Sequence, residues 1–317
     1  MSSSSLGLDI GGANLKFATP SKGKIIYFPI WKRWKELADV LKKIDDEFRP
    51  ERVGVVITAE LADVFKSKDE GVLYVSRAVE KAFPNSEIYF MDIDGNLKDR
   101  IDNPRNFAAS NWVASATFLL KNYDNFVFAD MGSTTTDLIP VTDKIMAAKT
   151  DYERLKRKEL IYFGVLRTPV FYLLPEFDVP LVPEYFAITA DAFILTGDIQ
   201  PSDYICDTPD GGGRDKKSCM LRLARTVCCD LEEVDSDYIM AIAGAVKEKM
   251  VEKVERAMLE ISERYGLDKV IGCGLGEFIL ERAAKKAGLH YISLTEKYGE
   301  MSKLFPAYAM AKLVEGL

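Results

Sequence analysis

Short apolar runs alternate with longer amphipathic stretches through the first half of the chain. Strands are predicted for the apolar runs at 6–10, 24–30, 52–59, 88–91 and 126–129. Helices are predicted where apolar residues recur at helical spacing, at 34–48, at 61–83 with a break at 70–71, and at 104–121. This alternation predicts a mixed α/β sheet with covering helices.

The second half of the chain is less regular, and its composition changes after Asp143. The predicted elements are a strand at 160–167, a long helix at 236–265, a strand at 269–273, and a closing helix at 304–314. At 317 residues the chain is long for one domain. We therefore predict two α/β domains, 1–143 and 144–317, with the last helix, 304–316, packing back on the first domain.

A polar turn interrupts the apolar hairpin predicted at residues 125–141. This turn spans residues 130–137, and we call it the second turn because a similar one occurs earlier in the chain. It carries Asp130, Gly132, Ser133, Thr134 and Asp137. Backbone N–H groups and hydroxyls beside a glycine suit an anion, and the two flanking carboxylates suit a divalent cation bound with phosphate. The alternative interpretation is a threonine-rich hairpin that only reflects good β-propensity.

A first turn, residues 9–16, has the same logic near the start of the chain. Asp9 ends a short apolar strand, Gly11 and Gly12 permit close backbone approach to a ligand, and Lys16 enters the next strand. An ordinary Gly-Gly hairpin is the alternative. If both turns lie at strand ends on one edge of one sheet, they face the same crevice.

Two further glycine-rich segments are candidates for ligand contact. Residues 207–215 carry three consecutive glycines, several carboxylates and Arg214, which indicates either a substrate-facing loop or a plain surface connection. Residues 272–276 contain Gly274 and Gly276 between a predicted strand and a predicted helix. This third glycine segment suits a nucleotide or phosphate at a helix N-terminus, or tight packing alone.

Composition narrows the classes of function. The net charge is −7 and no block of lysines and arginines stands out, which disfavours nucleic-acid binding. No run of about 18 apolar residues exists, so no membrane span is expected. The five cysteines form no Cys-x-x-Cys pair, which indicates a reducing, cytoplasmic location. His290 is the single histidine and lies near no nucleophile motif, which disfavours a Ser-His-Asp or Cys-His mechanism.

The three glycine segments, taken in order, resemble the phosphate-1, phosphate-2 and adenosine motifs of a known superfamily. That superfamily contains acetate and sugar kinases, actin and the heat-shock chaperones, and the resemblance spans nearly the whole chain. It implies two ribonuclease-H-like (actin-like ATPase) domains, with mixed sheets and flanking helices, around a central cleft.

A closer resemblance is to a hydantoinase-related archaeal family of methanogens, which has relatives in methylotrophs. The segments that carry it are 6–16 (Leu-Gly-Leu-Asp-Ile-Gly-Gly-Ala-Asn-Leu-Lys), 110–112, 130–137, 164–169 and 207–214. The resemblance implies the activity assigned to that family in methanofuran biosynthesis. In that reaction γ-glutamyltyramine is joined to a furanylmethyl diphosphate through an aryl ether, and diphosphate is released.

The sequence departs from the kinase pattern at one position. Kinases of the superfamily usually carry threonine after the Gly-Gly pair of the first motif, whereas this chain has Ala13. No separate motif for a sugar-activating aspartate is present either. Both departures argue against ATP as the phosphoryl donor and leave diphosphate binding intact. An ATP-dependent kinase or hydrolase and a non-catalytic nucleotide-sensing regulator remain the alternative functions.

The expected reaction assigns hypothetical roles to the turn residues. Asp9 and Asp130 are the candidates to hold Mg²⁺, Lys16 and Arg167 to neutralise the diphosphate, and Asp137 to accept the phenol proton. The expected diphosphate cradle consists of Gly11, Gly12, Gly132, Ser133 and Thr134. Asn111 and Arg214 are candidates to orient the substrates.

Overall fold

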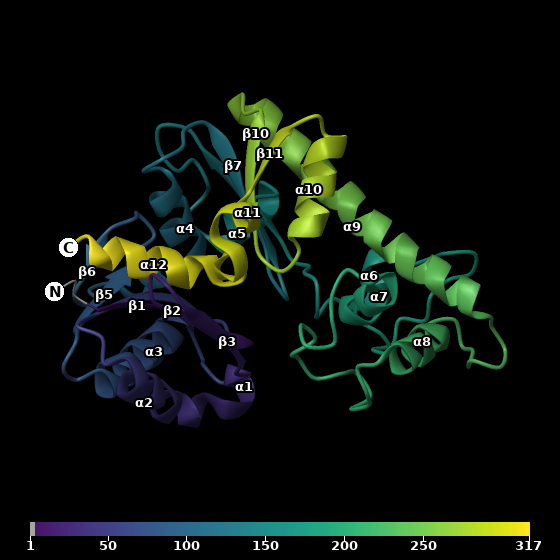
Figure 1. Cartoon of the computed structure of the whole chain (residues 1–317), viewed down its shortest axis with the longest axis horizontal. Helices are drawn as coiled ribbons and strands as arrows, with labels where there is room; N and C mark the ends of the chain where they lie inside the picture. Colours follow the sequence, from purple (N-terminus) through teal and green to yellow (C-terminus); the bar gives the residue numbers. More distant parts are fainter. Residues whose placement is uncertain (1–3) are drawn as a thin grey trace. The chain divides into compact units, whose positions relative to one another are not determined.

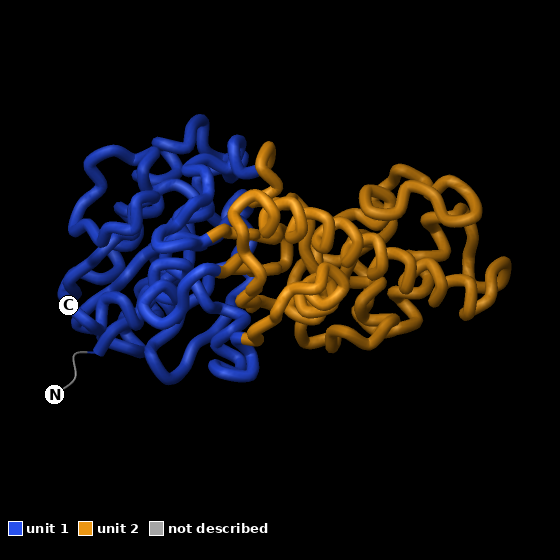
Figure 2. Tube along the Cα trace, turned by 90° about the horizontal axis from the view of Figure 1, so that it is seen from above, with its two compact units in different colours: residues 1–125, 141–154, 294–317 blue, residues 126–140, 155–293 orange. Residues whose placement is uncertain are grey.

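The chain forms two compact units in a computed structural model that describes residues 4–317. Among the described residues, unit 1 comprises 4–125, 141–154 and 294–317, and unit 2 comprises 126–140 and 155–293 (Figure 2). Each unit contains one sheet of its own. The domain boundary expected at residue 143 stays a prediction.

The sheet of unit 1 has six strands in the order β3-β2-β1-β4-β5-β6. Their bounds are β1 Ser5–Gly11, β2 Asn14–Ala18, β3 Gly23–Tyr27, β4 Arg52–Thr58, β5 Glu87–Met91 and β6 Leu97–Lys98. Strands β1, β4 and β5 are parallel, while β1 and β2 form an antiparallel hairpin. The carboxyl ends of β1, β4 and β5 therefore share one edge of the sheet.

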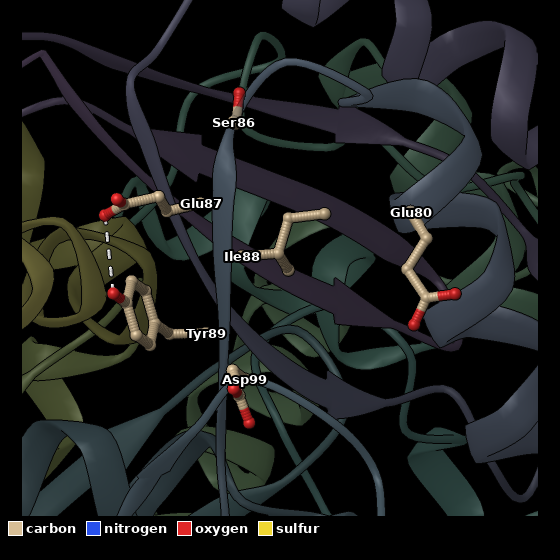
Figure 3. Close-up of a pocket in the computed structure, with 6 residues that line it drawn as sticks. All are labelled: Glu80, Ser86, Glu87, Ile88, Tyr89 and Asp99. Carbon is tan, nitrogen blue, oxygen red and sulfur yellow. Dashed lines mark hydrogen bonds between the residues drawn. The ribbon is translucent and has the colours of Figure 1, made fainter.

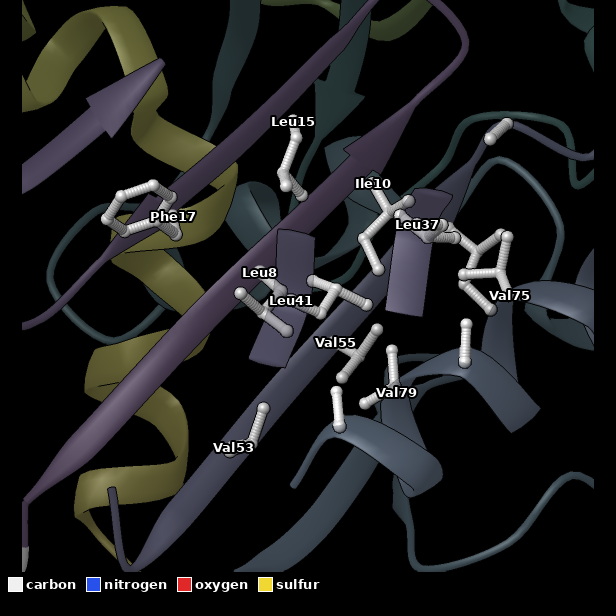
Figure 4. Packing of buried hydrophobic residues seen from close by; sticks show 14 of the residues in the cluster. Leu8, Ile10, Leu15, Phe17, Leu37, Leu41, Val53, Val55, Val75 and Val79 are labelled. Carbon is white, nitrogen blue, oxygen red and sulfur yellow. The ribbon is translucent and has the colours of Figure 1, made fainter. Parts of the chain in front are cut away.

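Helices cover both faces of this sheet (Figure 1). The helices of unit 1 are α1 Ile30–Arg33, α2 Leu37–Phe48, α3 Lys68–Ala82, α4 Asn111–Leu119, α5 Asp151–Lys156, α11 Leu294–Tyr298 and α12 Phe305–Glu315, with 3-10 turns at Trp34–Glu36, Pro104–Phe107 and Gly299–Leu304. On one face, Leu8 and Val55 of the strands pack with Leu41 of α2 and Val75 of α3 (Figure 4). Period-two alternation then turns the intervening residues to the other face.

The last helix, α12, packs on that other face of the unit 1 sheet. Gly7 of β1 lies so close to it that a Cβ there would stand 1.8 Å from the carbonyl oxygen of Ala307. Gly54 of β4 would meet Met310 in the same way, at 2.9 Å. These two glycines therefore admit α12 to direct contact with the strands.

Two predicted helices of unit 1 begin later than the sequence pattern indicated. The helix expected over 61–83 begins at Lys68, where the side chain of Ser67 accepts a hydrogen bond from Glu70 N–H, and it continues through Gly71 without the expected break. The helix expected over 104–121 is a 3-10 turn followed by α4. The interruption falls at Ala109, whose φ is 51°.

The sheet of unit 2 has five strands in the order β11-β10-β7-β8-β9. Their bounds are β7 Phe126–Met131, β8 Thr136–Val141, β9 Leu160–Ile161, β10 Lys269–Cys273 and β11 His290–Ser293. Strand β7 pairs in parallel with β10, with Asp130 opposite Cys273. The second turn thus belongs to a different sheet from the first turn, and the expectation of one shared sheet edge was wrong.

The helices of unit 2 include the long helix that the sequence predicts at 236–265. They are α6 Val170–Leu173, α7 Thr189–Thr196, α8 Lys216–Arg225, α9 Ser236–Tyr265 and α10 Glu277–Lys286. The long helix α9 begins after Asp235, which accepts a hydrogen bond from Tyr238 N–H, and ends at Gly266 with φ 67°. Within the described part of the chain, no helix combines the length and apolarity needed to cross a membrane.

Candidate active site

The first turn places Asp9 and Lys16 directly opposite each other across the β1–β2 hairpin. Asp9 is buried, at 3% exposure, and its carboxylate lies 3.4 Å from Lys16 Nζ. Thr58 at the end of β4 donates a hydrogen bond of 3.4 Å to the same carboxylate. The two predicted charges are therefore brought together at the carboxyl edge of the unit 1 sheet, where open α/β sheets bind ligands.

The glycine pair of the first turn has two different surroundings. A Cβ on Gly11 would stand 2.9 Å from the carbonyl oxygen of Asn14, so this position tolerates no side chain without a shift. A Cβ on Gly12 would meet nothing within 4 Å. Gly11 therefore serves the tight turn, while Gly12 leaves open space for close approach by a ligand.

The segment 163–168, which we call the 163–168 clamp, holds the second turn by backbone hydrogen bonds. The N–H of Val165 donates to Gly132 O, and the N–H groups of Leu166 and Arg167 both donate to Ser133 O, each at 3.0 Å. Only Leu160–Ile161 of the strand expected over 160–167 is extended in the sheet. The N–H groups of residues 165–167 bond to the turn instead of to a neighbouring strand, so the strand prediction was wrong there.

Hydrogen bonds of the second turn determine which of its groups are available to bind an anion. Gly132 N–H donates to Thr135 O at 3.0 Å, so it is used inside the turn. The hydroxyls of Ser133 and Thr134 lie 3.3 Å apart, and Arg167 Nη1 donates to Thr134 Oγ1 at 3.2 Å. A guanidinium and two hydroxyls therefore stand together, a combination that suits phosphate oxygens.

The third glycine segment packs against the second turn. A Cβ on Gly274, whose φ is 95°, would stand 2.5 Å from Asp130 Oδ1, and one on Gly276 would stand 2.3 Å from Met131 Sδ. Gly276 N–H also donates to Met131 O at 2.9 Å. The two glycines thus permit the close fit that holds Asp130, which is the packing alternative raised by the sequence.

The remaining predicted residues occupy separate places. Asp137 is buried near the start of β8, opposite Leu160. Asn111 is the first residue of α4 in unit 1. Arg214 of unit 2 donates to Cys206 O at 3.1 Å, within its own loop. The convergence of the first and second turns on one ligand stays a prediction.

A buried cation that sequence reasoning missed holds the glycine-rich loop at 207–215. Arg222 of α8 is fully buried and lies 2.7 Å from Asp191, which is also fully buried. It donates to Asp210 Oδ1 at 3.0 Å and to Gly213 O at 2.9 Å. These hydrogen bonds hold the loop against helix α8, and Arg214 follows directly after the residue that they fix, Gly213.

A second missed residue is Glu60, two positions after β4. Its side chain is 3% exposed, and burial raises the pKa of its carboxyl from 4.5 to about 7. The available sequence signal was a lone carboxylate that directly follows the strand predicted at 52–59. A buried carboxyl with such a pKa is typical of functional sites.

One surface hollow of about 440 Å³ lies away from these residues (Figure 3). It is lined by Glu80, Ser86, Glu87, Ile88, Tyr89 and Asp99. Three of these residues open strand β5, which runs parallel to β4. The hollow is therefore at the opposite edge of the sheet from Asp9 and is not part of the candidate site.

Each of the two turns carries one buried carboxylate, Asp9 or Asp130, of the kind that a hydrated Mg²⁺ takes. This ion commonly takes one or two carboxylates, keeps several waters and shares phosphate oxygens. Asp9 meets Lys16 and Thr58 only at 3.4 Å, so its oxygens are not held by short contacts with these two residues. Across residues 4–317, no group of three or more His, Cys, Asp or Glu side chains is arranged to hold a metal. A phosphate-bound Mg²⁺ does not require such a group.

Comparison with known families identifies the family to which the chain belongs. A family model described as hydantoinase/oxoprolinase matches residues 51–316. The chain belongs to this family. The matched range includes the second turn, the 163–168 clamp and the third glycine segment.

Two relatives of this hydantoinase/oxoprolinase protein carry the same name, (4-{4-[2-(γ-L-glutamylamino)ethyl]phenoxymethyl}furan-2-yl)methanamine synthase. The protein from Methanocaldococcus jannaschii is 43% identical, over 98% of this chain and 97% of the relative. The protein from Methanococcus vannielii is 37% identical, over 63% of this chain and 96% of the relative. The chain is therefore similar to archaeal synthases, as the sequence resemblance predicted.

Solved structures confirm the predicted fold class. A glucokinase of the ROK family from Streptomyces griseus, in complex with glucose and AMPPNP, superposes with a TM-score of 0.52 over 98% of both chains. The two sequences are only 10% identical. The likeness therefore establishes that the two chains share a fold, and it carries no information about the reaction.

Proposed function

We propose that this protein is a transferase that forms an aryl ether between the phenol of γ-glutamyltyramine and a furanylmethyl diphosphate, and releases diphosphate. The observation that carries the proposal is the 43% identity, over almost the full length of both chains, to a relative named as the synthase of the ether-linked product. The phenoxymethyl link in that name is the bond that this reaction forms.

The chemistry follows from the product. The phenolic oxygen forms a bond to the furanylmethyl carbon, the bond from that carbon to diphosphate oxygen breaks, and its electron pair leaves with the diphosphate. A furanylmethyl carbon can bear developing positive charge, so charge on the leaving group dominates the barrier. Groups that neutralise the departing diphosphate should therefore contribute most to the rate.

The turn residues supply groups of the required kind. Lys16 stands beside Asp9 in the first turn, and Arg167 beside Thr134 in the second. In this proposal both cations bind diphosphate oxygens, while the Ser133 and Thr134 hydroxyls donate hydrogen bonds to them. Asp9 and Asp130 would hold Mg²⁺, which adds positive charge at the leaving group. Asn111 and Arg214 are proposed to orient the substrates.

A direct assay tests the proposal. The protein is incubated with Mg²⁺, γ-glutamyltyramine and (5-aminomethylfuran-3-yl)methyl diphosphate, and the ether is sought by mass spectrometry while diphosphate is quantified. We expect both products in equal amounts. Parallel incubation of the acceptor with ATP should give no ADP. Formation of ADP without ether would refute the transferase and favour a kinase.

A further inference from the structure

Glu60 lies at the same sheet edge as the first turn. Strand β4 ends at Thr58, which is opposite Gly11 of β1 in the parallel ladder and donates a hydrogen bond to Asp9. Glu60 follows two residues later, and its backbone packs against Gly71 of α3, where a Cβ would stand 2.7 Å from Glu60 Cα. The carboxyl group is thus fixed to the framework of unit 1, next to the strand end that carries Asp9.

The backbone just before α4 is directed at this carboxylate. The backbone N–H groups of Ala109 and of Glu60 itself lower the pKa of this carboxyl and partly offset the effect of burial. Ala109 has φ 51°, a left-handed conformation that is strained for a residue with a side chain, and Ala108 before it bridges to Ile57 of β4. The backbone is therefore bent beside Glu60, two residues before Asn111.

Two buried polar atoms near this bend lack a partner within residues 4–317. They are Glu60 Oε2, an acceptor, and Trp112 Nε1, a donor on the first turn of α4. A buried polar atom without a hydrogen bond costs free energy. A donor and an acceptor left without partners near one bend therefore indicate a ligand that forms hydrogen bonds there. A phenolic hydroxyl can donate to a carboxylate and also accept a hydrogen bond.

The charged groups around Glu60 come from two helices. Asp151 of α5 raises the pKa of the Glu60 carboxyl, whereas Lys68 at the start of α3 lowers it. Asp151 is itself paired with Arg154 at 3.2 Å, and Arg154 stacks on Trp112 at 4.5 Å. Burial has the largest effect, and the resulting pKa of about 7 is close to the value that suits a base at neutral pH.

On the basis of the proposed function, we propose that Glu60 is the general base that accepts the proton of the phenol, directly or through one water. The carboxylate becomes a carboxylic acid, the phenolate oxygen forms the bond to the furanylmethyl carbon, and the electron pair of the broken C–O bond leaves with diphosphate. The proton on Glu60 then passes to solvent. This assignment replaces Asp137 as the candidate base.

The geometry favours Glu60 over Asp137 for this role. Asp137 lies in a strand, paired with Leu160 of β9, and the adjacent Leu138 N–H donates to Glu159 O. Glu60 lies beyond the end of its strand, at the edge where α/β sheets bind ligands. Its unpartnered oxygen also points to a ligand contact that the described protein groups do not supply.

The decisive experiment combines a pH profile with acceptors of graded acidity. The kcat/KM for ether formation is measured from pH 5.5 to 9 for the wild-type protein, Glu60→Gln and Asp137→Asn. A fluorinated analogue of γ-glutamyltyramine, whose phenol is already ionised at the upper pH values, serves as the second acceptor. Asp45→Asn is the matched control, because Asp45 is a buried carboxylate on α2 in the same unit.

We expect wild-type kcat/KM to fall about tenfold per pH unit below about pH 7, as the base becomes protonated. Glu60→Gln should lose about 10²–10⁴-fold with the ordinary acceptor and lose this pH dependence, and the fluorinated acceptor should restore much of the rate. Asp45→Asn should match the wild type. Binding of the diphosphate donor should be unchanged in Glu60→Gln, which shows that the site is folded.

Three outcomes overturn the inference. The first is an unchanged pH profile in Glu60→Gln. The second is an equal loss of turnover in Glu60→Gln for both acceptors at every pH, as a purely structural role predicts. The third is loss of the pH dependence in Asp137→Asn alone. Absence of ether formation by the wild-type protein refutes the proposed function itself. The two failures are thus distinguishable.

Discussion

Replacement of Glu60 by glutamine keeps the shape of the side chain and removes its charge, so it tests what burial of this carboxyl costs the fold. In the native state the carboxyl is shielded from water and its pKa is about 7, compared with 4.5 when it is exposed. Between these two values the native state retains a proton that the unfolded state has lost. Stability therefore falls as pH rises from about 4.5 to 7, and the full penalty persists above pH 7.

The size of the effect follows from the two pKa values. One pKa unit corresponds to about 1.4 kcal/mol, so ionisation of Glu60 should cost the fold about 3 kcal/mol at pH 8 and under 1 kcal/mol at pH 5. Glutamine has no proton to lose over this range. The free energy of unfolding of Glu60→Gln relative to the wild type should therefore increase by about 2.5 kcal/mol from pH 5 to pH 8.

Urea unfolding followed by tryptophan fluorescence measures this difference. The three tryptophans, Trp31, Trp34 and Trp112, all belong to unit 1, so the signal reports on the unit that contains Glu60. Comparison of the change with pH, instead of the absolute stability, cancels any constant effect of the amide on local hydrogen bonds. Glu80→Gln on the exposed surface of α3 is the control and should show no such trend.

The reasoning is refuted if the difference between Glu60→Gln and the wild type stays flat from pH 5 to 8. A flat difference would mean that the carboxyl is hydrated or compensated in the native state, and it would remove the basis for a base with a pKa near 7. A difference that decreases with pH would show that the ionised form is stabilised by the fold, which is the opposite sign.

Three further predictions concern unit 2. Asp130→Ala should abolish turnover while the circular dichroism spectrum stays unchanged; near-normal rates would remove Asp130 from the site. Gly274→Ala should lower the free energy of unfolding by more than the roughly 1 kcal/mol expected for a left-handed glycine alone, because its Cβ would strike Asp130. Gly197→Ala is the matched control, because Gly197 has φ 77° and open space around it. Equal losses of stability in urea for the two variants would contradict this prediction. Arg222→Met should cost about 3–5 kcal/mol by leaving Asp191 buried and unpaired; a loss under 1 kcal/mol in urea unfolding would show that the pair is dispensable.

The sequence alone determined most local features of this protein. The apolar alternation at Leu6–Ile10 specified a strand, and the hydroxyl-rich turn after Asp130 specified the tip of a hairpin. Asp235 and Gly266 correctly marked the limits of the long helix α9. These features were readable because backbone preferences and capping hydrogen bonds act over a few neighbouring residues.

Only the tertiary structure decided the features that depend on distant parts of the chain. Strand β7 joined the second sheet because it pairs with β10, about 140 residues away, and period-two alternation carries no information about which strand will be the neighbour. The N–H groups of residues 165–167 close the second turn instead of a sheet ladder. Glu60 became a candidate base only because α3 and the strained bend at Ala109 enclose it. Burial arises from packing of separate segments, so the pKa of a carboxyl is a property of the fold and cannot be read from its position in the sequence.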